Sequence, residues 1–228
     1  MKICLLYSKE DFPTAQMRGF LRGVFATKDL ISNQADILVI SEMDALAEAA
    51  DAISHKTKQM SCHGIFIDSE RPPEEEFVTF LLQSRFTVFM PFSKVFFGGV
   101  IPVIEAEVSG GSLSEYLESA RSAFPHFSVS IRRSAYEIAL PADEKPPREL
   151  SQKELRFLIS SYEPDIFFSP QLMCKYFLIN TEGDFVRLIL FDDSETISGK
   201  LRLAKKHGVS HAFLVYREIA DIFDNISF

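Results

Sequence analysis

Two carboxylates stand at the end of a short apolar run in the segment His63-Gly-Ile-Phe-Ile-Asp-Ser-Glu70. The apolar run predicts a buried β-strand, along which successive side chains point to opposite faces. Asp68 and Glu70 are two residues apart, so we expect them to point the same way. Pro72 and Pro73 have no N–H group to donate and end the strand. Acids at the carboxyl end of a buried strand occupy the catalytic position of α/β enzymes. The alternative is that they only cap or solvate the strand end.

A second pair of acids, Glu105 and Glu107, ends the apolar run 100–107 and also shares one face. If that face is the interior of the fold, as many as four acids meet there, with Asp68 and Glu70. Such a cluster suits acid–base chemistry, a hard cation held through oxygens, or balance by Arg132. The alternative is that Glu105 and Glu107 are solvated groups at a loop end.

The elements that must position these acids alternate along the chain. Continuous apolar runs between helical patterns, without a period of two, indicate a parallel sheet covered on both faces. Helices are expected over about 12–31, 42–59, 74–84, 113–124, 151–161 and 194–207. Parallel strands are expected at 2–7, 36–41, 64–68, 86–92, 100–107, 127–132 and 211–216.

The strand count favours a (β/α)8 TIM-type barrel, which closes with eight strands. Seven are recognised, so the amino-terminal part is either reduced by one strand or holds one irregular strand. A doubly wound open sheet is the competing fold, but no glycine-rich loop follows the first strand. A β-hairpin over 175–191, with a glycine-containing turn, precedes the last helix and strand. The loop at 141–148 is short, so residues 1–228 are expected to form one domain.

Composition limits the function classes. The chain has 228 residues and a net charge of −8, which argues against nucleic acid or an anionic membrane as a partner. Cys4, Cys62 and Cys174 lie in unrelated apolar runs, and neither they nor the five histidines have metal-ligand spacing. We therefore expect no metal and no cofactor. The apolar run at the amino terminus is too short for a signal peptide, which predicts a cytoplasmic protein.

The acidic strand resembles a known motif. Gly64, Asp68 and Glu70 match the glycine, the penultimate acid and the final glutamate of Asp-Gly-x-Asp-x-Asp-x-Glu, the fourth-strand motif of the family-18 glycoside hydrolases, or chitinase-like barrels. Residues 192–200, Asp-Asp-Ser-Glu-Thr-Ile-Ser-Gly-Lys, resemble that family's Asp-Asp-x-x-Ser-Ile-x-x-Lys after its hairpin. The strand up to Tyr216 resembles the last strand, which commonly ends in Trp-Arg in the subgroup associated with spore cortex peptidoglycan.

The chain also departs from the family's pattern. His63, Phe66 and Ser69 replace the first acid, the middle acid and the aromatic residue before the glutamate. If the sixth-strand Met-x-Tyr-Asp motif falls at 104–107, the chain offers Ile-Glu-Ala-Glu and no tyrosine. Tyr216 stands where the family's last strand has tryptophan. Asp192 and Asp193 are both expected to cap the helix that begins near residue 194.

The resemblance implies a substrate-assisted mechanism, in which the acetamido oxygen of an N-acetyl sugar attacks the anomeric carbon. Glu70 would protonate the leaving oxygen, and Asp68 would orient and stabilise the intermediate. The implied substrate-binding residues around the barrel mouth are Glu105, Glu107, Tyr216 and Tyr7.

Two functions are open at this point. In the first, the chain hydrolyses a β-1,4-linked N-acetylhexosamine polymer such as peptidoglycan or chitin. In the second, it is a degenerate barrel that binds a glycan or a protein without turnover. A cytosolic chain fits spore association if it is deposited on a spore from the mother cell.

Overall fold

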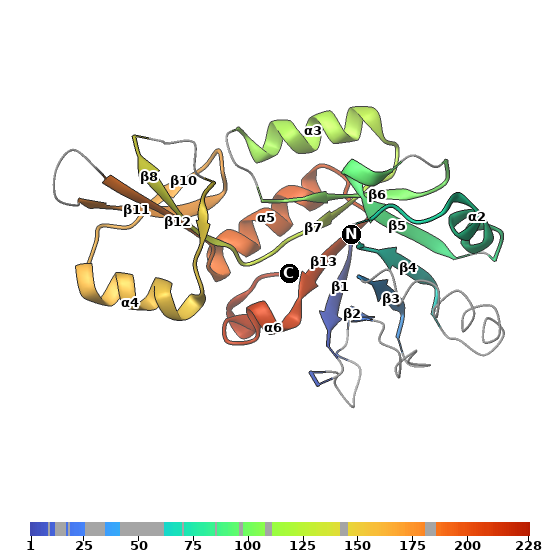
Figure 1. The fold of residues 1–228 in the computed structure, drawn as a ribbon, viewed down its shortest axis with the longest axis horizontal. Helices are drawn as coiled ribbons and strands as arrows, with labels where there is room; N and C mark the ends of the chain where they lie inside the picture. The colour runs from blue at the N-terminus through green and yellow to red at the C-terminus, as the bar shows by residue number, and fades with distance from the viewer. Residues whose placement is uncertain are drawn as a thin grey trace.

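Eight parallel strands close the barrel that the alternating pattern predicts (Figure 1). In the order around the barrel these strands are β1 (Lys2–Tyr7), β13 (His211–Val215), β7 (Ser128–Ser130), β6 (Ile101–Glu105), β5 (Thr87–Pro91), β4 (Gly64–Ile67), β3 (Ile37–Ile40) and β2 (Phe20–Phe25). The fold is therefore a (β/α)8 TIM-type barrel. This computed structural model describes residues 1–8, 10–11, 17, 19–25, 35–41, 62–69, 71–84, 86–95, 98–107, 111–141, 146–180 and 186–228.

Strand β2 is the one that the sequence analysis did not recognise. It pairs with β1 and β3, so the barrel is complete rather than reduced by one strand. The predicted helix over 12–31 is wrong at 20–25, where Arg22 and Gly23 interrupt the apolar run and hide the strand pattern. A Cβ atom at Gly23 would collide with the Leu6 side chain, so glycine allows β2 to approach β1 closely. The helix predicted at 42–59 lies outside the described residues.

The inside of the barrel is filled by alternate side chains of the strands. Phe66, Phe89 and Phe213 pack there, with ring centroids 4.8 and 5.2 Å from Phe213. Cys4 and Leu6 of β1 also point inward, so Tyr7 points outward. This alternation decides which residues can reach the mouth of the barrel.

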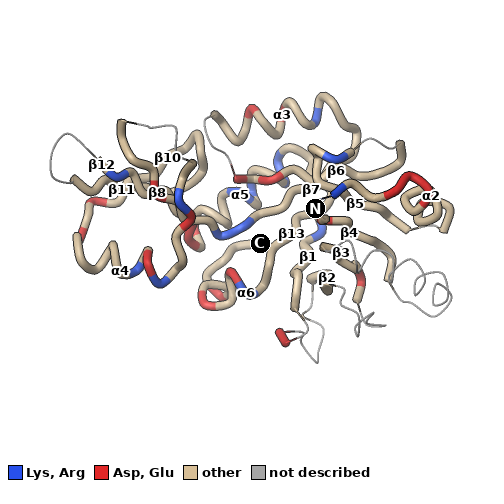
Figure 2. The backbone as a smooth tube through the Cα atoms, in the orientation of Figure 1, with Lys and Arg blue, Asp and Glu red and all other residues tan. Residues whose placement is uncertain are grey.

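Helices cover the outer face of the barrel. They are α2 (Glu75–Gln83), α3 (Leu113–Ala123), α5 (Ser194–Lys206) and the short α6 (Tyr216–Ile219), with 3-10 turns η1 (Phe92–Lys94) and η2 (Phe223–Asn225). The first three confirm helices predicted at 74–84, 113–124 and 194–207. Glu75 and Glu76 place negative charge in the first turn of α2, where the helix dipole favours it (Figure 2). No helix in the described ranges is long and apolar enough to cross a membrane.

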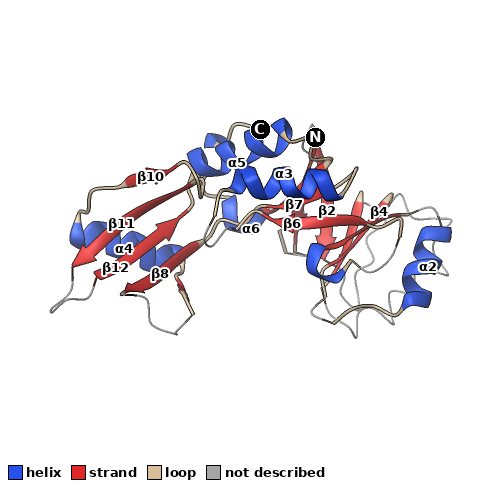
Figure 3. Cartoon of the chain, turned by 90° about the horizontal axis from the view of Figure 1, so that it is seen from above, coloured by secondary structure: helices blue, strands red, loops and turns tan. Residues whose placement is uncertain are grey.

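An antiparallel sheet is inserted between β7 and α5 and lies beside the barrel (Figures 1 and 3). The predicted hairpin is confirmed as β11 and β12, but it belongs to a larger sheet. In order across the sheet, its strands are β10 (Phe167–Ser169), β11 (Cys174–Asn180), β12 (Val186–Phe191), β8 (Ala135–Leu140) and β9 (Arg148–Glu149). Helix α4 (Gln152–Tyr162), predicted at 151–161, packs along one face of this sheet.

The two faces of the inserted sheet differ. Phe177 and Ile189 are fully buried against α4. The other face carries apolar side chains in register across three strands, with Leu188 between Leu178 and Ile138. Leu188 and Ile138 are only half-buried, and Leu178 is exposed. This second face looks towards the barrel mouth and forms part of the site described below.

One titrating group in the barrel gives a pH-dependent prediction. His211 begins β13 and packs edge-on against Phe89, with ring centroids 5.0 Å apart. Its half-buried position, together with the charges of Lys2 and the amino terminus, lowers its pKa to about 4. The unfolded chain, with a histidine pKa of about 6.5, therefore binds the proton more readily. Stability that His211 contributes above about pH 6.5 should be lost as the pH falls towards 4.

The urea concentration at the unfolding midpoint should fall between about pH 7 and pH 5. We expect this fall to be smaller for a His211→Gln variant than for the parent. His126, which is exposed, gives the matched control His126→Gln, whose pH dependence should follow the parent. Equal pH dependence of the parent and the His211→Gln variant would contradict the prediction.

Candidate functional site

A cavity of about 130 Å³ lies at the mouth of the barrel, where β4, β5, β6 and β7 end. It contains three of the four predicted acids, Asp68, Glu105 and Glu107; Glu70 lies outside the described residues. Phe66 and Val103 point into the barrel. Asp68 is two residues after Phe66, and Glu105 and Glu107 are two and four residues after Val103, so strand alternation directs these acids to the same side. The cavity is lined by Phe66, Asp68, Pro91, Val103, Glu105, Glu107, Ser130 and Arg132.

Asp68 is held at the end of β4 by its backbone, which donates to the carbonyl oxygen of Ile40 at 2.8 Å. Its side chain is solvent-accessible, but the surrounding protein desolvates it enough to raise its pKa. Lys94 opposes this rise, and Glu105 adds to it. Lys94 also donates from Nζ to the carbonyl oxygen of Ser69 at 2.5 Å. Asp68 therefore takes up a proton more readily than an ordinary aspartate.

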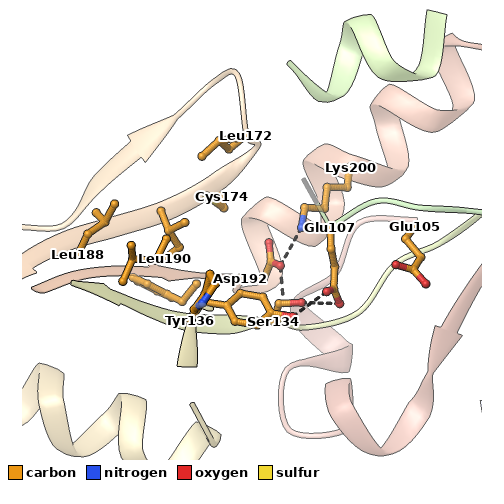
Figure 4. A pocket seen from close by; sticks show the side chains of 13 residues that line it. Glu105, Glu107, Ser134, Tyr136, Leu172, Cys174, Leu188, Leu190, Asp192 and Lys200 are labelled. Atoms are coloured by element: carbon orange, nitrogen blue, oxygen red, sulfur yellow. Dashed lines mark hydrogen bonds and ion pairs between the residues drawn. The ribbon is translucent and has the colours of Figure 1, made fainter. Parts of the chain in front are cut away.

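Glu107 is fixed by two hydroxyl groups, one from Ser134 just before β8 and one from Tyr136 in β8. Ser134 Oγ donates to Oε1 at 2.7 Å, and the Tyr136 hydroxyl donates to Oε2 at 2.8 Å (Figure 4). Burial and the bond to Glu107 raise the pKa of Tyr136 to about 12, so its hydroxyl stays a donor. Arg132 Nε lies 4.0 Å from Glu107 Oε1, while its NH2 group pairs with Glu218 at 2.9 Å.

A buried ion pair joins α5 to the inserted sheet. Lys200 Nζ donates to Asp192 Oδ2 at 2.7 Å, and the two side chains are only 4% and 3% exposed. Asp192 also accepts from the Thr196 hydroxyl at 2.9 Å. The prediction that both Asp192 and Asp193 cap α5 is wrong for Asp192. Asp193 is the cap, accepting from the backbone of Glu195 and Thr196, while Asp192 faces the interior and meets Lys200.

A larger cavity of about 530 Å³ opens between the barrel mouth and the inserted sheet (Figure 4). Glu105 and Glu107 line both cavities, so the two cavities adjoin at these residues. The wall towards the inserted sheet is apolar. The larger cavity is lined by Glu105, Glu107, Ser134, Tyr136, Ile138, Pro147, Leu172, Cys174, Leu188, Leu190, Phe191, Asp192 and Lys200.

Tyr7 and Tyr216 are not brought together with the acids. Their rings pack against one another, 5.0 Å between centroids, in the layer outside the barrel, and neither lines either cavity. Tyr7 is 1% exposed, and burial raises its pKa to about 12. The reason is the strand alternation, which turns Tyr7 away from the inside of the barrel.

Sequence reasoning missed the groups that come from the inserted sheet. Ser134, just before β8, and Tyr136 and Ile138 of β8 follow a period of two and all line the larger cavity. Their period of two in Ser-Ala-Tyr-Glu-Ile-Ala-Leu was a usable signal for a strand with one face turned to a site. Within the described part of the chain, no group of three or more His, Cys, Asp or Glu side chains is arranged to hold a metal ion.

Comparison with known proteins bears on the fold. No family model matches the chain, and no curated protein does. Solved structures do: a family GH18 chitinase from Cycas revoluta in complex with allosamidin matches with 11% identity and a TM-score of 0.62, over 99% of this chain and 98% of that one. The Bacillus cereus spore cortex-lytic enzyme SleL matches with 14% identity and a TM-score of 0.61, over 99% and 74%.

The chain has the chitinase fold. A class V chitinase from Nicotiana tobaccum, solved as a mutant in complex with NAG4, matches with 11% identity and a TM-score of 0.58, over 92% of each chain. Within this chain's chitinase fold, Asp68 follows the fourth barrel strand in chain order and Glu107 follows the sixth. These are the strands that the motif resemblance assigns to them.

Proposed function

We propose that the chain is a glycoside hydrolase that cleaves a β-1,4-linked polymer containing N-acetylhexosamine, such as peptidoglycan or chitin. The observation that carries the proposal is the placement of Asp68, Glu105 and Glu107 around one cavity at the carboxyl ends of β4 and β6. A spore-associated chain made in the cytoplasm, acting on peptidoglycan, is the biological setting that we propose.

The chemistry follows from the groups at the mouth. Glu70 comes two residues after Asp68 in the sequence, and in our proposal it protonates the glycosidic oxygen. Asp68, two residues away, orients the N-acetyl group and balances the charge that develops when the acetamido oxygen attacks the anomeric carbon. Glu107 cannot shift freely, because Ser134 and Tyr136 hold both of its oxygens. It is therefore suited to hold a sugar hydroxyl or amide in a fixed place.

Binding without turnover is the second candidate, and two observations favour it. Phe66 occupies the motif's middle acid position and is 3% exposed, packed against Phe213 inside the barrel. Ala106, at the position of the motif's tyrosine, is buried in the outer layer. A barrel that lacks both groups could hold a glycan or a protein partner without cleaving it.

The test is to incubate the parent protein with N-acetylglucosamine oligomers and measure reducing ends and binding separately. We expect the parent to cleave them, and Asp68→Asn to lower the rate by about 10²-fold while binding persists. The reason is that the amide keeps the shape of the carboxyl group but cannot balance positive charge. Asp165→Asn, at an exposed loop position, is the matched control and should leave the rate unchanged.

The outcomes separate the two candidates. Binding of oligomers by a parent that releases no reducing ends favours the non-catalytic function. A parent that neither binds nor cleaves these oligomers would rule out both glycan functions.

A further inference from the structure

The larger cavity is chemically unlike a site for a polysaccharide. A sugar ring brings many hydroxyl groups, each of which needs a partner when it leaves water. Most polar groups in this cavity already bind one another. Glu107 accepts from Ser134 and Tyr136, and Asp192 accepts from Lys200. Each Glu107 oxygen keeps only part of its accepting capacity, so this cavity offers few free partners for the many hydroxyl groups of a further sugar ring.

Apolar side chains make up the rest of the cavity. Leu188, Leu190 and Ile138 project from the uncovered face of the inserted sheet. Leu172 and Cys174 continue the wall beside Leu188 and Leu190 (Figure 4). Leu188, Leu190 and Ile138 are half-buried, so contact with an apolar group would remove more of their surface from water. The cavity therefore favours a hydrocarbon chain.

The cavity adjoins the barrel mouth at two carboxylates. Glu105 and Glu107 line both spaces, and Glu105 is exposed. Among the described residues, the Glu105 side chain has no hydrogen-bond or ion-pair partner, so its carboxylate can accept a bond from a hydroxyl or amide N–H at the junction. A ligand with a polar ring in the barrel mouth and a hydrocarbon tail in the larger cavity would match the chemistry of both.

We propose that the ligand is an amino sugar acylated with a chain longer than acetyl, whose sugar occupies the mouth and whose acyl chain occupies the cavity lined by Leu188 and Leu190. This inference rests on the proposed function and extends its substrate class from N-acetyl to longer N-acyl amino sugars. The amide group lies at the junction, where Glu105 accepts from its N–H. A peptide substituent fits less well, because its backbone N–H and C=O groups would be buried against leucine side chains without partners.

The experiment measures the affinity of the parent protein for glucosamine acylated with acetyl, butanoyl, hexanoyl and octanoyl groups, below the critical micelle concentrations. We expect affinity to rise along the series, by roughly fourfold for each methylene that is fully buried. Unmodified N-acetylglucosamine oligomers are measured alongside. If they bind but affinity is independent of acyl length, the inference is overturned and the proposed function stands. If neither they nor the acyl series binds, both fail.

Two variants and one further ligand sharpen the result. Leu188→Trp fills the cavity and should abolish the dependence on acyl length. Leu178→Trp is the matched control, because Leu178 pairs with Leu188 on the same face but does not line the cavity. It should keep the dependence. Octanoate without the sugar should bind more weakly than octanoylglucosamine; equal affinity would overturn the placement of the sugar in the mouth. The length series on the parent decides the inference even if Leu188→Trp does not fold.

Discussion

Replacing Glu70 by glutamine should slow hydrolysis of N-acetylglucosamine oligomers by about 10²–10⁴-fold, the usual contribution of a general acid. Glutamine keeps the size of the side chain but has no acidic proton to give to the leaving oxygen. Oligomer binding should survive, because the amide fills the same space. Glu70 carries this role in our proposal because it comes two residues after Asp68 in the sequence and matches the final glutamate of the family motif.

The control for this substitution is Glu76→Gln, which removes an exposed carboxylate from the first turn of α2, a short distance along the chain. Its rate should match the parent. Single-turnover rates and binding constants should be measured separately, since only the chemical step should change. A parent that is active and whose rate is insensitive to Glu70→Gln would refute the proposed mechanism while leaving the fold intact.

Replacing Lys200 by methionine should lower the free energy of unfolding by about 3–5 kcal/mol, the cost of leaving a buried charge without its partner. Asp192 would remain 3% exposed, with hydrogen bonds from Thr196 but no cation. The double variant Asp192→Leu, Lys200→Met removes both charges and should recover most of the loss. The measurement is urea unfolding followed by circular dichroism.

Lys205→Met provides the matched control, because Lys205 lies in the last turn of the same helix and is exposed. It should change stability by less than about 0.5 kcal/mol. If Lys200→Met lowered the free energy of unfolding by no more than Lys205→Met does, the buried pair would not hold α5 to the sheet. We also propose that residues 1–228 unfold as one domain, in which case every variant should show a single transition.

The barrel could be predicted because most of its strands are apolar on both faces. Six of the eight strands in the barrel appear in the sequence as largely continuous apolar runs, and β7 (Ser128–Ser130) lies in the seventh predicted strand, 127–132. The exception is β2, whose Arg22 and Gly23 mimic the polar positions of a helix. The Arg22 side chain has a partner in the Asp36 carboxylate, whose Oδ2 lies 3.8 Å from Arg22 Nε, and no local pattern in the sequence predicts this contact.

The acids of the site could be predicted from local spacing, but their environment could not. Asp68, Glu105 and Glu107 each follow an apolar strand, and strand alternation alone brings them to one mouth. Tyr136, a partner of Glu107, lies in β8, and helix α3 and strand β7 separate it from Glu107 along the chain. Only the tertiary fold brings the two side chains together. Asp192 was misassigned for the same reason, since Lys200 is a partner inside the molecule rather than a neighbour at the helix end.

The position of the inserted sheet affects how the protein is made. Strand β13 completes the barrel by pairing with β1 on one side and β7 on the other. During synthesis, β1 and β7 therefore emerge from the ribosome long before β13, and until β13 is made each has one unpaired strand edge. The inserted sheet, with its own core against α4, is composed of contacts closer in sequence. It can order first, while the open barrel relies on late closure and is exposed to aggregation until then.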